Sequence, residues 1–197
     1  MPCRSRVVSA RHDGRVTLRG KLLVATPPLV DPNFDRTVVL LLEHGDEGAL
    51  GVVLNRPGDD PVGDVLRDWA PWVCAPDVLF SGGPVEQGAI IGLGRAPSAQ
   101  AGEHWAPVLG TIGTVDLAAD PDRLDPPVEA LRIFRGYAGW GAGQLEGELE
   151  AGAWIVADFQ LDDAFGEQPG DLWRDVLRRQ GGRTAWLADY PDDPDVN

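Results

Sequence analysis

The sequence predicts one domain of the α+β class. Two apolar runs, Thr37–Leu42 and Ala49–Leu54, flank a short polar loop and indicate a β-hairpin. Apolar residues at helical spacing occur only in short, scattered segments. This irregular order disfavours a doubly wound parallel sheet. The chain has 197 residues, the size of one domain, and contains no repeat or linker that would divide it.

The expected strands are apolar runs bounded by turn residues. Leu22–Ala25 forms a buried strand that Thr26-Pro27-Pro28 ends. The two hairpin runs are too short for buried helices, and the loop Gly45–Gly48 joins them. Further strands are expected at 78–80, 89–93, 108–117 (one or two strands), 130–137 and 154–159.

Helices are expected where apolar residues recur every three or four positions. The spacing predicts helices over Val62–Trp69 and Asp171–Gln180, and Asp171 is the expected N-cap of the second. Gln144–Glu150 is expected as a short helix. Residues 96–103 form a loop, and residues 120–127, rich in Asp and Pro, form a loop or a short helix.

The charge of the chain is unevenly distributed. It holds 31 acidic and 17 basic residues, a net charge of −14, whereas its start is rich in arginine. We therefore predict a flexible basic arm over residues 1–19, a globular body over 20–188 and an acidic flexible tail over 189–197. The arm either contacts nucleic acid or an acidic partner, or is a loose leader that docks on its own domain. The acidic body disfavours direct nucleic-acid binding, which depends on neutralising phosphates.

Targeting and metal-binding patterns are lacking in this sequence. No apolar stretch has the length of a signal-peptide core or a membrane helix, so we expect a cytoplasmic protein. Cys3 and Cys74 do not form a disulfide framework. The three histidines are far apart, and no HxH, CxxC or HExxH pattern occurs. We expect no bound metal and no cofactor.

The segment Gly136–Gly147 is rich in glycine and admits two interpretations. Glycine-rich loops before a helix can bind phosphate through backbone N–H groups. Glu146, Glu148 and Glu150 disfavour this, and neither Lys nor Ser/Thr follows the glycines as in a Walker motif. We predict a tightly packed strand-to-helix turn anchored by Tyr137 and Trp140. A ligand or partner site is the alternative.

Polar residues gather at the predicted strand ends, where sites often assemble. Glu43-His44 offers a base with its orienting carboxylate, or ordinary hydrogen bonding at a strand end. Arg56 is expected to approach Glu43 across the hairpin, with Asp31 and Arg36 nearby. The turn after Ser81 lacks the Gly-x-Ser-x-Gly pattern of a hydrolase nucleophile.

Several segments in order carry a family resemblance. They are Gly20–Pro27, Asp31–Val39, Glu43-His44, Gly48-Ala49, Gly51, Asn55–Pro57, Gly82–Val85 and Gly136–Glu146. On these the chain resembles the YqgE/AlgH family of bacterial proteins from about Gly20 to Gln180. The resemblance implies a bifurcated mixed β-sheet that includes a small closed barrel and is surrounded by helices. Some members are labelled transcriptional regulators, but the resemblance implies no reaction, cofactor or catalytic residue.

We therefore expect a non-enzymatic binding or regulatory domain whose partner is a protein or a small molecule. A hydrolase using His44 with Glu43 is the alternative. The oligomeric state stays open, and no catalytic residue is assigned. The candidate binding residues are Asp31, Arg36, Glu43, His44, Asn55, Arg56, Gly82, Gly83, Tyr137, Trp140, Gln144 and Glu146.

Overall fold

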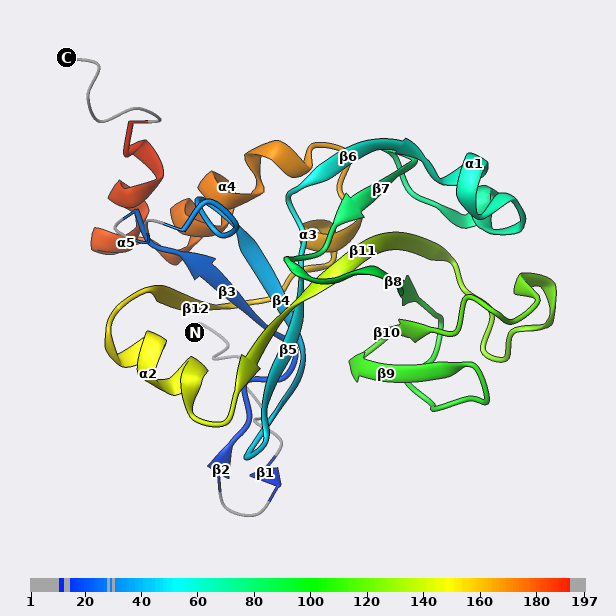
Figure 1. Ribbon diagram of the computed structural model, residues 1–197, viewed down its shortest axis with the longest axis horizontal. Helices are drawn as coiled ribbons and strands as arrows, with labels where there is room; N and C mark the ends of the chain where they lie inside the picture. The colour runs from blue at the N-terminus through cyan, green and yellow to red at the C-terminus, as the bar shows by residue number, and fades with distance from the viewer. Residues whose placement is uncertain (1–10, 13–14, 28, 30, 192–197) are drawn as a thin grey trace, which may run out of the picture.

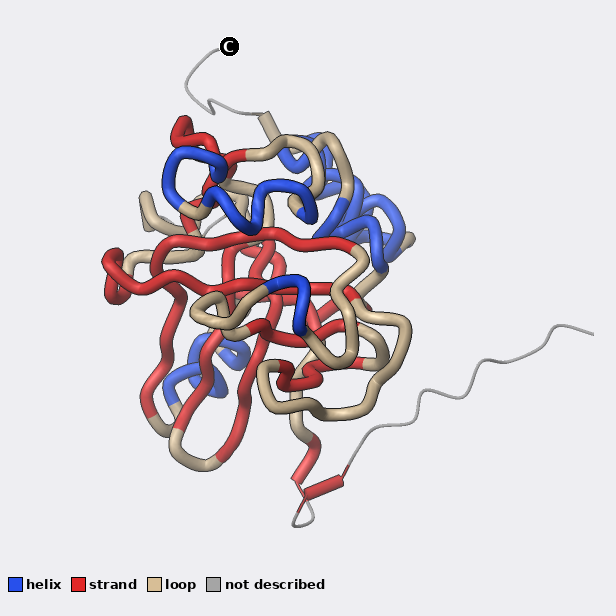
Figure 2. The backbone as a smooth tube through the Cα atoms, turned by 90° about the vertical axis from the view of Figure 1, so that its right-hand side faces the viewer, coloured by secondary structure: helices blue, strands red, loops and turns tan. Residues whose placement is uncertain are grey.

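A ten-stranded sheet dominates the computed structural model, which describes residues 11–12, 15–27, 29 and 31–191. Its main path runs β12-β3-β4-β5-β11-β8-β10-β9, and neighbours on this path are antiparallel (Figure 1). Figure 2 shows that the sheet curls rather than lying flat. The strands are β3 (Lys21–Ala25), β4 (Val38–Gly45), β5 (Gly48–Val53), β8 (Val85–Arg95), β9 (Trp105–Leu109), β10 (Ile112–Val115), β11 (Ala130–Gly141) and β12 (Trp154–Asp158).

The sheet branches at β11. Strand β6 (Pro57–Pro61) pairs with β7 (Val78–Ser81), and β7 pairs in parallel with β11, which makes the sheet mixed. The α+β class is therefore confirmed. The small closed barrel that the resemblance implied does not appear among the pairings of the described residues, because β12 and β9 end the main path without closing it.

The predicted hairpin is confirmed as β4–β5. Gly45 pairs with Gly48, so the connecting loop is only Asp46-Glu47. The register shifts between Leu41 and Glu43, which indicates a β-bulge in β4. Sequence reasoning found the two strands because their apolar runs are uninterrupted, as in strands that are covered on both faces.

Helices cover both faces of this part of the sheet. Leu22 and Val24 pack with Trp173 of α4 (Leu172–Gln180), whereas Leu23, between them, packs with Leu145 of α2 (Gln144–Glu150). Successive strand residues point to opposite faces, so an unbroken apolar run supplies two cores. Figure 1 shows α4 along the upper side of these strands and α2 below them.

A separate apolar core lies under the segment after β6. It includes Val62, Trp69 and Leu131. The helix expected over 62–69 is divided into α1 (Val62–Val65) and a 3-10 helix η1 (Arg67–Trp72), because Leu66 leaves helical geometry with φ −132° and ψ 66°. Trp69 stays inward and donates from Nε1 to the carbonyl of Leu117 at 3.0 Å.

Other differences from the sequence predictions concern the ends of elements. β11 continues through the glycines to Gly141, so the expected turn shortens to residues 142–143 before α2, whose bounds were predicted correctly. Asp171 occupies the predicted N-cap position of α4, but its side chain makes no capping hydrogen bond. The sequence analysis missed β6, α3 (Leu161–Phe165), α5 (Gly182–Trp186) and the 3-10 helices η3 (Pro169–Asp171) and η4 (Leu187–Asp189). The loop or short helix that was expected over residues 120–127 contains the 3-10 helix η2 (Pro121–Arg123).

The predicted arm and tail lie largely outside the described residues, which exclude 1–10, 13–14 and 192–197. Within the arm, β1 (Arg11–His12) pairs with β2 (Arg15–Val16). Arg19 donates from Nε to the carbonyl of Leu42 at 3.0 Å, so the end of the arm belongs to the folded body. Among the described helices, none has the length and apolar character to cross a membrane.

Candidate functional site

Asn55 and Arg56 hold the turn that precedes β4. The Asn55 side chain accepts from the Val38 backbone N–H at 2.9 Å and donates to the Arg36 carbonyl at 2.8 Å. Arg56 donates from Nη2 to the Asp35 carbonyl at 2.8 Å. These bonds satisfy backbone groups where the strand ladder ends, which is a structural task.

Asp31 and Arg36 lie in the same turn. Asp31 accepts through Oδ1 from the Asn33 backbone N–H at 2.8 Å, which is the geometry of an Asx turn. Arg36 has a positive φ of 51°. Its guanidinium carbon lies 5.1 Å from the ring centroid of Trp173, and Nη2 donates to the Tyr190 carbonyl at 3.3 Å. Arg36 thus ties the C-terminal segment to the turn.

Glu43 lies at the other end of the hairpin. It pairs with Leu50 near the loop, whereas Val39 pairs with Val53, just before Asn55 and Arg56. The predicted approach of Arg56 to Glu43 is therefore wrong. In an antiparallel hairpin with its loop at 45–48, Glu43 lies at the loop end and Arg56 follows the far end of the second strand, so the two do not meet across it.

His44 is engaged through both ring nitrogens. Nδ1 accepts from the Leu18 backbone N–H at 3.1 Å, and Nε2 lies 3.1 Å from Oε1 of Glu146. A backbone N–H only donates, so Nδ1 carries no proton and Nε2 donates to the carboxylate. Glu43 is exposed and adjacent along a strand, where neighbours point to opposite faces. Of the two interpretations of Glu43-His44, the structure shows hydrogen bonding at a strand end: His44 links Leu18, just before β3, to α2, and Glu43 does not orient it.

Glu148 joins two indole rings beneath the glycine-rich segment. Its Oε2 accepts from Nε1 of Trp140 at 2.8 Å and from Nε1 of Trp154 at 2.7 Å. Phe34 lies against both rings, with centroid distances of 6.2 Å and 5.5 Å. The three aromatic residues and one carboxylate form a packed cluster in which each buried N–H has an acceptor.

Gln144 completes the start of α2. Its Oε1 accepts from the Gly141 backbone N–H at 3.1 Å, and its Nε2 donates to Oε1 of Glu148 at 3.0 Å. Glu146 likewise binds His44. The first two polar side chains of α2, Gln144 and Glu146, therefore both bond to other groups of this protein, which supports packing as the role of the glycine-rich segment.

Gly82 and Gly83 allow β7 to pass close to β11. The Gly82 backbone N–H donates to the Arg135 carbonyl at 2.8 Å. Gly83 has φ 151°, and a Cβ there would lie 2.2 Å from the carbonyl carbon of Tyr137. Glycine is required here because the two backbones are in direct contact.

Tyr137 offers a test of the local electrostatics. Its pKa is raised above 10.0, mainly by desolvation and also by the charge of Glu86, which accepts its hydroxyl hydrogen bond. The folded state thus retains a proton that the unfolded state loses, so stability falls as the pH rises above about 10. In a Tyr190→Phe background, which leaves Tyr137 as the only tyrosine, absorbance titration should give a midpoint above 10.0.

The matched variant of this titration is Glu86→Gln. Removing the charge should lower the midpoint of Tyr137 without restoring 10.0, because desolvation remains. An unchanged midpoint in Glu86→Gln would show that the carboxylate does not act on the hydroxyl.

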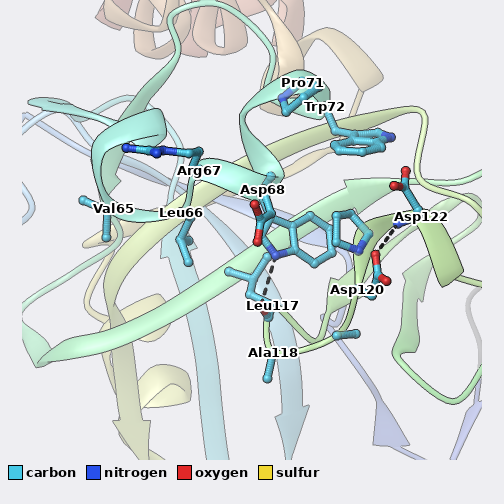
Figure 3. Close-up of a pocket in the computed structure, with 13 residues that line it drawn as sticks. Val65, Leu66, Arg67, Asp68, Pro71, Trp72, Leu117, Ala118, Asp120 and Asp122 are labelled. Carbon is cyan, nitrogen blue, oxygen red and sulfur yellow. Dashed lines mark hydrogen bonds between the residues drawn. The ribbon is translucent and has the colours of Figure 1, made fainter.

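The twelve predicted residues do not surround one cavity. They lie at the two ends of the hairpin and at the β7–β11 crossing, and their role in binding a partner stays a prediction. A pocket of about 820 Å³ lies elsewhere, between η1 and the loop after β10 (Figure 3). There Asp120 accepts through Oδ1 from the Asp122 backbone N–H at 3.1 Å, and none of the predicted residues lines it.

A second pocket, of about 610 Å³, lies where β11 meets α3 and α4. Arg132 lines it from β11 and is only 1% exposed. Its Nη2 donates to the carbonyls of Ala75 at 3.0 Å and Gly166 at 3.1 Å. Gly166 also lines this pocket, so Nη2 of Arg132 is bonded to a residue of the pocket wall. One face of the guanidinium covers the ring of Phe80, with 4.4 Å to the centroid.

The remaining donors of Arg132 have no acceptor. Nε and Nη1 are buried and make no hydrogen bond to the described residues, and no described carboxylate pairs with the guanidinium. Burial lowers the pKa of Arg132, and the nearby Cys74 partly opposes this. A buried cation without a counter-charge is costly, so this arrangement is uncommon in a purely structural residue.

The comparisons with known proteins agree with the earlier resemblance. Residues 22–185 match the family described as AlgH-like. The chain belongs to the AlgH-like family. A UPF0301 protein of Streptomyces coelicolor is 55% identical over 185 residues, covering 92% of this chain and 96% of its own. A UPF0301 protein of Mycobacterium marinum is 44% identical over 183 residues, covering 90% of each chain.

Two solved structures are similar to this AlgH-like chain. The crystal structure of a Corynebacterium diphtheriae protein has a TM-score of 0.82 at 34% identity, covering 86% of this chain and 91% of its own. The solution structure of the AlgH protein from Pseudomonas aeruginosa has a TM-score of 0.67 at 29% identity, covering 93% of this chain and all of its own. These likenesses confirm the family and the mixed α+β fold.

The sequence analysis of this AlgH-like chain missed Arg132. The available signal was an arginine between Leu131 and Ile133, within the apolar start of the predicted strand 130–137. Burial of that arginine depends on α3 and α4, which follow much later in the chain. In the part of the chain that the structure describes, no cluster of three His, Cys, Asp or Glu residues is arranged to bind a metal.

Proposed function

We propose that this AlgH-like chain is a non-catalytic binding domain whose ligand presents an anionic group to Arg132. One observation carries the proposal: Arg132, only 1% exposed, lines a pocket of about 610 Å³, and its Nε and Nη1 are unpaired among the described residues. An anion in this pocket would supply the missing counter-charge. Arginine is well suited to carboxylate and phosphate groups. The pocket volume suits a small molecule.

The proposed role is regulatory and does not involve direct contact with nucleic acid. Arg132 bonds to the segment after η1 at Ala75 and to the end of α3 at Gly166, so a bound anion would act on three parts of the fold together. We propose that a bound anion in this way controls a contact with a protein partner. The net charge of −14 opposes binding to a polyanion.

No observation favours the hydrolase alternative. His44 binds Leu18 and Glu146 through its two ring nitrogens. Glu43, its proposed partner in catalysis, points away from it. A general base needs a free nitrogen within reach of a nucleophile, and His44 offers none in this arrangement.

The test measures the effect of added anions on the guanidinium of Arg132 itself. Protein labelled with ¹⁵N-arginine is titrated with acetate and, separately, with inorganic phosphate, while NMR records the Nε–H resonance of Arg132. We expect a saturable shift of this resonance with at least one of the two anions. At ten times the Kd, binding should stabilise the fold by about 1.4 kcal/mol. This corresponds to a rise in Tm of roughly 4 °C.

Two variants define the outcome. Arg132→Gln should abolish the rise in Tm, whereas Arg123→Gln, which removes an exposed arginine outside the lining of this pocket, should retain it. The proposal fails if the Arg132 resonance of the folded wild-type protein is unmoved by both anions. It also fails if a folded Arg132→Gln variant binds them as wild type does.

A further inference from the structure

We infer that the ligand of the Arg132 pocket is zwitterionic, with an anionic group at the base and a cationic group at the mouth. This inference rests on the proposed function. It comes from the distribution of charge over the pocket wall, where a buried cation lies beneath exposed carboxylates.

The base of the pocket holds one free positive charge. Arg132 has no carboxylate partner among the described residues. The other arginine of the wall, Arg179, is already neutralised. Its Nη1 and Nη2 donate to the two carboxylate oxygens of Asp163 at 2.6 Å and 2.7 Å, and Asp163 is only 6% exposed. Arg132 is therefore the one arginine of this wall that has no carboxylate partner among the described residues.

The mouth of the pocket is acidic. Asp162, Glu167 and Asp175 line it, and all three are exposed. Asp162 and Glu167 form no ion pair with the described residues, and Asp175 has only a contact of 3.9 Å with Arg178. Three exposed carboxylates thus line the same pocket as one unpaired, buried cation.

This arrangement selects against a simple anion. An anion that moves toward Arg132 must pass close to the carboxylates. At such short distances physiological salt screens the repulsion between the charges only in part. A ligand with an ammonium group at its outer end exchanges that repulsion for attraction, while its inner end still pairs with the guanidinium. The charge pattern fits an amino acid, or another amine that carries a carboxylate or a phosphate.

The test compares ligands that differ only by the cationic group. Calorimetric titration of the full chain measures the Kd of 6-aminohexanoate against hexanoate, and of 2-aminoethyl phosphate against ethyl phosphate. We expect the amine-bearing member of at least one pair to bind at least tenfold tighter. The two pairs distinguish a carboxylate from a phosphate at the inner end. The preference should shrink as salt is raised.

Variants assign the preference to the mouth of the pocket. Asp162→Asn with Glu167→Gln should reduce the ratio of the two Kd values to less than twofold, while the anion still binds. The matched control, Glu47→Gln with Asp59→Asn, removes the same charge from exposed sites outside the pocket and should keep the ratio. Arg132→Gln should abolish binding of all four ligands.

The outcomes separate the two proposals. If hexanoate and ethyl phosphate bind through Arg132 as tightly as their amine-bearing counterparts, the zwitterion inference is overturned and the anion site remains. An unchanged ratio in the Asp162/Glu167 variant overturns it as well. If none of the four ligands binds and the Arg132 resonance is unmoved by acetate and phosphate, the proposed function itself is wrong.

Discussion

Replacing Gly83 by alanine is expected to destabilise the fold by about 4 kcal/mol, a large part of the stability of a typical domain. The φ of 151° at this position is rarely adopted by a residue with a side chain. The added Cβ would lie 2.2 Å and 2.3 Å from the carbonyl carbon and oxygen of Tyr137, and 2.4 Å from the backbone nitrogen of Ala138. These contacts are with backbone of β11, so no side chain can move aside. Urea unfolding measures the loss.

The matched control is Gly88→Ala in the neighbouring strand. A Cβ at Gly88 would meet no atom within 4 Å, and its φ is not in the positive range. We expect a change within about 0.5 kcal/mol. Equal stability of the Gly83 and Gly88 variants would show that β7 and β11 do not approach as closely as the structure has them.

Replacing Asp163 by alanine is expected to destabilise the protein by about 3 kcal/mol, because it leaves a partly buried charge unpaired. Asp163 accepts two bonds from Arg179 and one from the Gln160 backbone N–H at 2.6 Å. The guanidinium of Arg179 also donates to the Asp158 carbonyl at 2.8 Å, so the pair connects α3, α4 and the end of β12. The free energy of unfolding in urea is the quantity to measure.

Two comparisons make the Asp163 result specific. Asp162→Ala removes the adjacent, exposed carboxylate and should change stability by less than about 0.5 kcal/mol. The double variant Asp163→Leu with Arg179→Met removes both charges and should be more stable than Asp163→Ala alone, since no unpaired charge remains. A single variant that is as stable as the Asp162 control would contradict the role of the pair.

Local patterns predicted much of the fold. The hairpin was evident because two apolar runs flank a loop with glycine at each end, and Gly45 and Gly48 do pair across it. Helix α2 was predicted with its exact bounds from a short run after the glycines. The strand β6, by contrast, has the sequence PGDDP and is exposed throughout, so neither apolar content nor alternation marks it. Only pairing with β7 makes it a strand.

The candidate site was predicted less well than the fold. Asn55, Arg36 and Asp31 were chosen as polar residues at strand ends, and they do come together, but their side chains bond to backbone groups, of the same turn for Asn55 and Asp31 and of Tyr190 for Arg36. A polar side chain that satisfies a backbone group and one that binds a ligand have the same sequence signal. The two cases differ only in whether an unpaired backbone group lies next to the side chain in the folded protein. That depends on the register in which the strands pair.

The glycine-rich segment shows what the sequence by itself determined: a strand, a tight connection and a helix whose glutamates disfavour phosphate. The tertiary structure decided what those glutamates do, since Glu146 meets His44 and Glu148 meets two tryptophans from separate strands. It also decided that Arg132 is buried. The physical reason is that desolvation and counter-charge depend on every segment packed around a group, and these segments are distant in the chain.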